Sequence, residues 1–248
     1  MPNFDFKDQN VLITGGTRGI GASLTRAFLS AGASVIATYR SNHDAAMAFS
    51  QSLGEESSRL ECVACDVTDV EAVDSLYARL DETELKLDIL INNGGIRRDA
   101  VAAMMSASDW KDVIDTNLTG AFLMSKQAIK NMMRQRYGRI INISSPMSRE
   151  AFAGQSNYSA SKGGLESMTR SMCKEVGSRK ITVNCVSPGF IETELIDDLD
   201  EETVKTYKKM VPVRRFGKPE EVADAVLFLG DKSSGYISGS VLEISGGL

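Results

Sequence analysis

Hydrophobic residues along the chain form short continuous runs, separated by longer stretches in which apolar positions recur at helical spacing. The runs are rich in Val, Ile and Leu, which is typical of strands covered on both faces of a sheet. They predict strands at Asn10–Thr14, Ser34–Thr38, Leu60–Ala64, Leu87–Ile91, Arg139–Ile143, Ile181–Val186 and Val241–Ile244.

The stretches between the runs are amphipathic and predict helices at Gly19–Ala31, Asp44–Leu53, Asp69–Leu80, Ser108–Arg136, Ser156–Val176 and Glu220–Leu229. Repeated alternation of strand and helix predicts an α/β fold, a Rossmann-type doubly wound parallel sheet of about seven strands with helices on both faces. No repeat, low-complexity tract or linker divides residues 1–248, so we expect one domain.

One segment, Pro188–Gly217, interrupts the alternation. It mixes apolar and charged residues, with a short helix expected near Glu201–Met210. An insertion of this size after the carboxyl end of a strand commonly holds a ligand in α/β proteins. We therefore expect a mobile substrate lid. The alternative is an ordinary surface loop without a role in binding.

Composition narrows the function classes. The net charge of −5 argues against a general nucleic-acid binder, whose domain is usually basic on at least one face. The N-terminus lacks a basic and apolar signal sequence, and no stretch approaches the length of a transmembrane helix. Few, scattered cysteines fit a reducing compartment. We expect a cytoplasmic protein without membrane insertion.

The pair Cys62 and Cys65 forms a CxxC, a spacing found in redox and zinc sites. It lies in the apolar run ECVACDV, which predicts a strand, and no second pair completes a zinc site. The chain has one histidine, His43, in a polar turn-like setting. We expect no metal site, and any acid–base chemistry must use other groups.

The first predicted strand runs directly into TGGTRGIG, Thr14 to Gly21. Gly15, Gly19 and Gly21 allow a sharp turn and a close approach of backbone N–H groups to a pyrophosphate, and the following helix N-terminus adds a partial positive charge. A glycine cluster between a strand and a helix, at the start of a βαβ unit, predicts a dinucleotide site.

The end of the second predicted strand indicates which nucleotide is bound. An NAD-preferring site places an acidic residue there to bind the ribose hydroxyl, but no acid occurs before Asp44. Arg40 follows this strand and Arg18 lies in the glycine loop. Two guanidinium groups suit a 2′-phosphate, which favours NADPH, unless both arginines are simply solvated.

Tyr158 and Lys162 are four residues apart and share one face of a predicted helix. A neighbouring ammonium favours the phenolate and lowers the pKa of a tyrosine. Ser145 ends the RIINISS strand, where its hydroxyl would reach a substrate oxygen. Such Tyr–Lys pairs are common on ordinary helices, so the significance of this one comes from its occurrence with the nucleotide loop.

Over essentially its whole length the sequence resembles the short-chain dehydrogenase/reductase family. TGGTRGIG matches the family's TGxxxGxG, and NNGG (Asn92–Gly95) matches NNAG. The resemblance implies a catalytic set of Asn117, Ser145, Tyr158 and Lys162. It implies cofactor contacts from Gly15, Thr17, Arg18, Gly19, Ile20, Gly21, Arg40, Asp66, Val67, Asn93, Gly95, Tyr158, Lys162, Pro188, Gly189, Ile191 and Thr193.

By the same resemblance, Tyr158 donates the proton and Ser145 steadies the carbonyl. Lys162 lowers the tyrosine pKa and holds the nicotinamide ribose, and Asn117 anchors a water. Two positions depart from the pattern. Gly94 stands where the family has alanine, which is expected to loosen the backbone, and Pro146 directly follows the catalytic serine and would reshape the substrate wall. The ISGGL chain end is expected to change subunit contacts.

Within the family the sequence is most similar to 3-oxoacyl-acyl-carrier-protein reductases. Arg136 and Arg179 match positions that dock the acidic carrier protein, and Arg134, Arg139 and Lys180 extend the basic patch in sequence. The resemblance implies NADPH-dependent reduction of a 3-oxoacyl thioester in fatty-acid or polyketide-type biosynthesis, by a homotetramer.

Two alternatives stay open. The chain would reduce 3-oxoacyl-CoA, acetoacetyl-CoA or another small carbonyl by the same chemistry. In another class, it would be a structural or weakly active subunit of a reductase or synthase complex, although the intact Asn–Ser–Tyr–Lys set argues against this.

Overall fold

The computed structural model describes residues 4–194 and 200–248. Within these ranges seven strands form one parallel sheet in the order β3-β2-β1-β4-β5-β6-β7. The strands are β1 (Asn10–Ile13), β2 (Ser34–Tyr39), β3 (Leu60–Ala64), β4 (Ile89–Asn92), β5 (Gly138–Ile143), β6 (Ile181–Pro188) and β7 (Val241–Ile244). The order reverses between β1 and β4, the switch point where ligands bind in open α/β sheets. The predicted fold class is confirmed.

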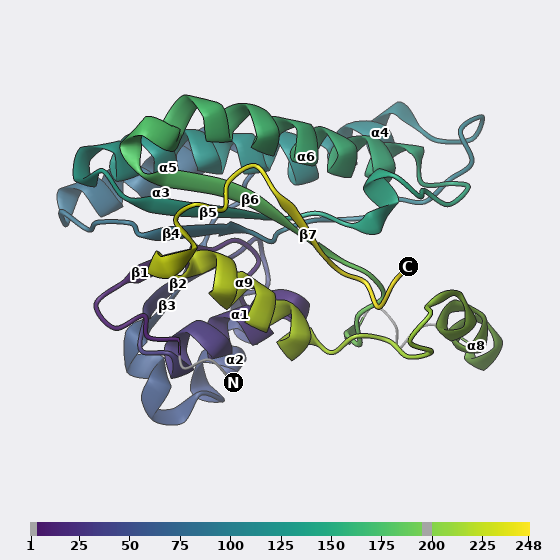
Figure 1. Cartoon of the computed structure of the whole chain (residues 1–248), viewed down its shortest axis with the longest axis horizontal. Coiled ribbons are helices and arrows are strands. Elements are labelled where there is room, and N and C mark those ends of the chain that lie inside the picture. Colours follow the sequence, from purple (N-terminus) through teal and green to yellow (C-terminus); the bar gives the residue numbers. More distant parts are fainter. Residues whose placement is uncertain (1–3, 195–199) are drawn as a thin grey trace.

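Helices cover both faces of the sheet (Figure 1). One face carries α3 (Val70–Glu82), α5 (Gly120–Gln135) and α6 (Ser156–Val176). The other carries α1 (Gly19–Ser30), α2 (His43–Gln51) and α9 (Pro219–Gly230). Short 3-10 helices occur at Gly54–Arg59, Pro146–Ser148, Gly177–Arg179 and Lys232–Ser234.

The single helix expected at Ser108–Arg136 is divided in the structure. It consists of α4 (Ala107–Ile114), a π-helical turn at Asp115–Thr119 and α5. Arg136 terminates α5 with a left-handed backbone, φ 56°. A π-helical turn inside an α-helix frequently marks a functional position, and this one contains Asn117.

Two apolar layers hold the sheet in place. Phe28 of α1 and Val226 of α9 belong to one, and Met124 of α5 and Leu80 of α3 belong to the other. Phe28 is fully buried and packs edge-on against Phe6, with ring centroids 4.8 Å apart. Each such side chain stabilises the fold by about 1.5–3 kcal/mol. The two apolar layers therefore hold in place the strand ends that carry the candidate site.

The expected lid segment leaves the sheet after β6, and its helix α8 (Glu201–Met210) lies to one side of the sheet (Figure 1), where Tyr207 stacks on Phe190. The base of the segment is closed, because Gly217 N donates to the Phe190 carbonyl (2.9 Å) and Glu192 N to the Gly217 carbonyl (2.8 Å). Val213 N donates to the Gly246 carbonyl (3.3 Å), so the chain end packs on this segment. Residues 195–199 of the segment lie outside the described residues.

Cys62 is half-buried and Cys65 is buried, and both are structural residues. Cys62 lies in β3 and Cys65 just beyond it, and both are free thiols. Burial raises the pKa of Cys65 to about 11, which disfavours the thiolate that redox and zinc chemistry need. His43 is exposed, with its Nδ1 2.7 Å from the Tyr39 hydroxyl. Residues 4–194 and 200–248 contain no group of three potential metal ligands.

Among the helices of residues 4–194 and 200–248, none combines the length and the apolar character needed to span a membrane.

Candidate active site

The glycine loop forms a cradle between β1 and α1. Gly15 and Gly19 have positive φ angles, 61° and 51°, which side chains rarely adopt. A Cβ on Gly21 would lie 2.1 Å from the Gly15 carbonyl oxygen, so only glycine fits there. The three glycines thus have the steric roles that the sequence predicted.

The N-terminus of α1 is left open toward this cradle. Arg18 caps the helix without a side-chain hydrogen bond, whereas Asn42, Asp69, Ser106 and Asp200 each accept a backbone N–H at the start of α2, α3, α4 and α8. Free N–H groups and the helix dipole together favour an anion such as a pyrophosphate. Thr17 and Ile20 belong to the same turn. The residues present therefore fit the dinucleotide.

The end of β4 is tied to the glycine loop. Asn93 Nδ2 donates to the carbonyl oxygens of Thr14 (3.0 Å) and Gly15 (3.1 Å). Gly94 N donates to Thr14 Oγ1 at 2.9 Å. A Cβ on Gly94 would lie 3.3 Å from that oxygen, a tight contact. The glycine that replaces the alanine of NNAG thus lies in a well-ordered turn, because these hydrogen bonds tie the turn to the glycine loop.

The expected adenosine-binding residues surround the ends of β1, β2 and β3. Arg18 and Arg40 are exposed beyond the ends of β1 and β2. Asp66 follows β3 and accepts from Thr68 N (2.9 Å) and Thr68 Oγ1 (2.8 Å). Val67 packs on Gly120, where a Cβ would lie 2.6 Å from Val67 Cγ2.

Tyr158 and Lys162 share one face of α6, as predicted. Lys162 Nζ lies 5.6 Å from the Tyr158 ring centroid and donates to the Ile143 carbonyl at 2.7 Å. Lys162 is only 4 % exposed, and burial lowers its pKa to about 8. Burial raises the pKa of Tyr158, while a hydrogen bond with Ser145 and the charge of Arg97 lower it.

Ser145 is held at the end of β5 by its neighbours. Glu166 of α6 is buried, and its Oε1 accepts from Ser144 Oγ (2.9 Å) and Ser148 Oγ (2.7 Å), on either side of the catalytic position. Pro146 is buried at the first position of the 3-10 helix Pro146–Ser148, where proline is favoured. It therefore stabilises the turn that follows Ser145.

Asn117 connects three elements. It is 1 % exposed, and its side chain exchanges hydrogen bonds with the backbone of Ile96, at 2.8 Å to N and 3.0 Å to O. Its Nδ2 also lies 3.1 Å from Ser161 Oγ of α6. A Cβ on Gly95 would lie 3.2 Å from Asn117 Oδ1 and 3.7 Å from Lys162 Nζ, so these residues are neighbours.

The segment after β6 returns to the glycine loop. Pro188 ends the strand and is buried, and a Cβ on Gly189 would lie 2.9 Å from Ser245 Cα. Ile191 is buried, and Thr193 is the nearest neighbour of Gly19, with its Cγ2 3.9 Å from the position of an added Cβ. The segment after β6 thus lies next to the glycine loop, at the carboxyl edge of the sheet.

Sequence reasoning missed the residues at the mouth of the site. Arg97 lies over the Tyr158 ring, 6.0 Å from its centroid. Phe190 stacks on Tyr207 of α8 with centroids 4.7 Å apart, and Phe152 lies parallel to both rings. The only sequence signal for Arg97 is its place just after the NNGG strand end, and nothing in the sequence connects the three aromatic residues.

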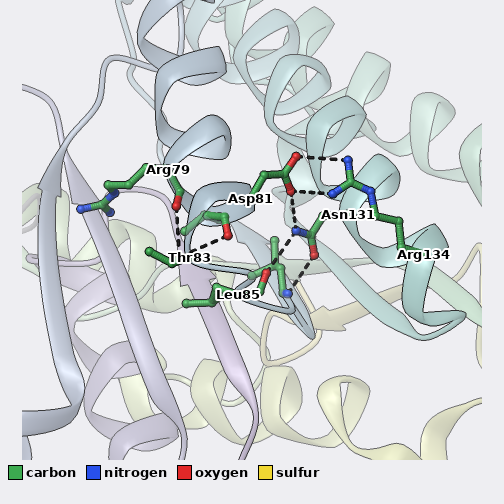
Figure 2. Close-up of polar contacts among 8 residues, drawn as sticks. Arg79, Asp81, Thr83, Leu85, Asn131 and Arg134 are labelled. Atoms are coloured by element: carbon green, nitrogen blue, oxygen red, sulfur yellow. Dashed lines mark hydrogen bonds and ion pairs between the residues drawn. The ribbon is translucent and has the colours of Figure 1, made fainter.

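Arg136 and Arg179 lie elsewhere, at the amino edge of the sheet before β5 and β6. Both are exposed, and Arg136 Nη2 donates to the Ser178 carbonyl at 3.3 Å, which brings the two arginines together. Arg134 does not extend their patch freely, because it is paired with Asp81 at 2.9 and 3.1 Å (Figure 2).

Arg139 does not belong to the expected basic patch, because it is buried. It is 3 % exposed and lies over the Tyr137 ring at 4.7 Å. Its guanidinium donates to the carbonyls of Gly138 (3.0 Å), Asp231 (3.3 Å) and Lys232 (3.3 Å). Arg139 is therefore a structural residue, because its position in β5 directs its side chain into the protein.

Comparison with known proteins agrees with this geometry. A family profile described as enoyl-(acyl carrier protein) reductase matches residues 15–248. The 3-oxoacyl-acyl-carrier-protein reductases of Vibrio harveyi and Aquifex aeolicus are 42% and 40% identical, each over 237 residues and 96% of both chains. The chain belongs to the short-chain dehydrogenase/reductase family. The predicted family is thereby confirmed.

Other proteins are similar to this short-chain dehydrogenase/reductase over nearly its full length. The Escherichia coli 3-oxoacyl-acyl-carrier-protein reductase is 38% identical over 244 residues and 98% of both chains. A crystal structure of a putative gluconate dehydrogenase from Agrobacterium tumefaciens has a TM-score of 0.95 at 33% identity, covering 100% of this chain and 98% of the other. Family membership makes the chain an NAD(P)-dependent oxidoreductase.

Proposed function

We propose that this chain reduces a 3-oxoacyl thioester, carried on acyl carrier protein, to the 3-hydroxyacyl thioester with NADPH. The observation that carries the proposal is the meeting of Asn117, Ser145, Tyr158 and Lys162 beside the open N-terminus of α1. The relatives named as 3-oxoacyl-acyl-carrier-protein reductases support the substrate class. The chain would act in the cytoplasm as one domain, with 188–217 as its lid, in fatty-acid or polyketide-type biosynthesis.

The side chains have complementary roles in this reaction. Ser145 and Tyr158, close enough for the Ser145 hydroxyl to lower the pKa of the tyrosine, hold the substrate carbonyl oxygen together. Tyr158 gives that oxygen its proton as negative charge develops there. The Lys162 ammonium stabilises the phenolate left behind, and Asn117 orders the turn beside it. NADPH supplies the hydride when bound, with Arg18 and Arg40 at its 2′-phosphate.

The proposal is tested by NADPH oxidation with a short 3-oxoacyl pantetheine thioester. We expect turnover with this substrate, and a lower kcat/KM with NADH, because two guanidiniums recognise the 2′-phosphate. A trans-2-enoyl thioester with NADPH, and gluconate with NADP+ followed as NADPH formation, serve as controls, since the family profile and a solved relative are named for those activities. Turnover of either control alone would overturn the proposal, and no turnover of any would favour a structural subunit.

Carrier-protein docking gives a separate prediction. The double variant Arg136→Glu, Arg179→Glu reverses an exposed positive patch, so association with an acidic carrier protein should weaken by roughly 10-fold or more. The measurement is kcat/KM with 3-oxoacyl-acyl-carrier-protein and with the CoA thioester, which should be spared. Arg134→Gln is the matched control, because Asp81 already pairs with that arginine. Equal losses on both substrates would count against docking.

The place of this patch bears on assembly. Tyr158 lies in the first turn of α6 and Arg179 just beyond its end, so the helix separates them by roughly 30 Å. Phe122 and Met133 of α5 are exposed apolar residues on the same layer. We propose a homotetramer, built on these long helices and the C-terminal strand. Antiparallel pairing of two α6 helices then brings the docking arginines of one subunit to Tyr158 of the next.

Mixed oligomers distinguish docking and reduction on different subunits from docking and reduction within one subunit. Tyr158→Phe subunits dock but lack the proton donor, and the double arginine variant retains the donor but not the patch. Refolded together, they should recover activity with the carrier-protein substrate if docking and reduction occur on different subunits. Activity no higher than the sum of the separate variants would show that each subunit serves its own site.

A further inference from the structure

Arg97 is the nearest cation to the Tyr158 ring outside α6 in the described part of the chain. It lies on the connection from β4 to α4, and its guanidinium carbon is 6.0 Å from the ring centroid. The pKa of Arg97 is raised, chiefly by its hydrogen bond to Asp99, and Tyr158 and Tyr207 of α8 add smaller contributions, so both tyrosines are near the guanidinium. The family resemblance assigned Arg97 no role.

The guanidinium is held in this position by its neighbours. Asp99 pairs with it, with Nε to Oδ1 at 3.3 Å and a second contact through Nη2. Asp99 Oδ2 also accepts from Gln155 Nε2 at 3.1 Å, and Gln155 is buried. Asn157 Nδ2 donates to the Arg98 carbonyl at 2.8 Å. The loop is thereby attached to the start of α6, one residue from Tyr158.

Several groups face Tyr158 from the surrounding elements. Lys162 lies one turn on in α6, Ser145 lies at the end of β5, and Arg97 and Asp99 face it from the β4–α4 connection. Burial raises the pKa of Tyr158 most strongly, and Ser145 and then Arg97 lower it. Asp99 opposes them, but its effect is smaller than that of Arg97.

We propose that Arg97 is a positioning residue that acts through Tyr158. Its guanidinium, fixed across the ring by Asp99 and Gln155, stabilises the phenolate that forms when Tyr158 gives up its proton. Lys162 would stabilise the same phenolate from within α6, so the donor lies between two cations of different elements. The consequence for turnover rests on the proposed function, whereas the electrostatic contact does not.

Titration of Tyr158 in the cofactor-free protein tests the contact directly. The tyrosinate absorbance of each protein is followed against pH, and the same curve in a Tyr158→Phe background is subtracted. Removal of the cation in Arg97→Gln should move the Tyr158 titration to higher pH by about half to one pH unit, for a half-exposed charge at this distance. Arg97→Lys keeps the charge, so its Tyr158 titration should lie at least halfway back from that of Arg97→Gln to that of the wild type.

Arg98→Gln is the matched control, because it removes a neighbouring exposed guanidinium that donates only to the Arg97 carbonyl. It should leave the titration in place. A shift in Arg97→Gln no larger than that in Arg98→Gln would overturn the inference, whatever the activity. The oxidation of a 3-hydroxyacyl thioester provides the second readout, since it needs the phenolate and its acidic limb should move to higher pH in Arg97→Gln alone. If no variant oxidises the thioester while the titration shifts, the proposed function fails and the contact stands.

Discussion

Tyr158→Phe is expected to lower kcat for reduction of a 3-oxoacyl pantetheine thioester by about 10²–10⁴-fold, the usual contribution of a positioned proton donor. The substitution removes only the hydroxyl, and the ring that Arg97 and Lys162 both approach remains. NADPH affinity, measured by the change in cofactor fluorescence, should stay within a few-fold, because Gly15, Gly19 and the α1 N-terminus are unchanged.

Tyr137→Phe is the control for this experiment. Its hydroxyl donates to Gln9 Oε1 at 3.3 Å, at the amino edge of the sheet and away from the tetrad. It should retain wild-type kcat with the pantetheine substrate. Turnover of Tyr158→Phe within tenfold of wild type would exclude tyrosine as the proton donor, even if Tyr137→Phe behaved as expected.

The parts of the site that the sequence predicted are those governed by local constraints. The need for glycine at position 21 can be predicted from the sequence, because a Cβ there would clash with the carbonyl oxygen of Gly15 in the same turn. Tyr158 and Lys162 share a helix face by spacing alone, and α8 was placed at Glu201–Met210 because its polarity pattern is self-contained. Continuous apolar runs such as Val11–Ile13 predicted the parallel sheet, since these residues of β1 are all buried.

The parts that were missed depend on contacts between distant segments. Arg97 faces Tyr158 only because Gln155 holds Asp99, a contact that spans 56 positions. The stack of Phe190 on Tyr207 forms only when the segment after β6 folds back. Arg139 was assigned to a surface patch because charged residues are usually exposed, and its burial depends on three carbonyl acceptors from two regions of the chain.

Lys162→Met is expected to lower kcat by roughly 10²-fold or more and, at the same time, to stabilise the cofactor-free protein. Lys162 is 4 % exposed, and burial lowers its pKa from 10.5 to about 8. Because one pKa unit corresponds to about 1.4 kcal/mol, burying this ammonium costs about 3 kcal/mol. Methionine fills a similar volume without charge. After loss of the hydrogen bond to Ile143, a net gain of about 1–2 kcal/mol in the free energy of unfolding remains at pH 7.

The pH dependence identifies the source of that gain. Below pH 8 the ammonium is protonated in both states, so the folded wild type bears the full cost of burial. Between about pH 8 and 10.5 the unfolded wild type binds more protons than the folded one, so its stability rises with pH. Urea unfolding at fixed protein concentration should therefore show an advantage of Lys162→Met at pH 7 that shrinks as the pH approaches 10.5. Lys174→Met changes an exposed lysine of the same helix and should show neither effect. An advantage of Lys162→Met that stays constant with pH would mean that better packing, and not the removal of a buried charge, stabilises the variant.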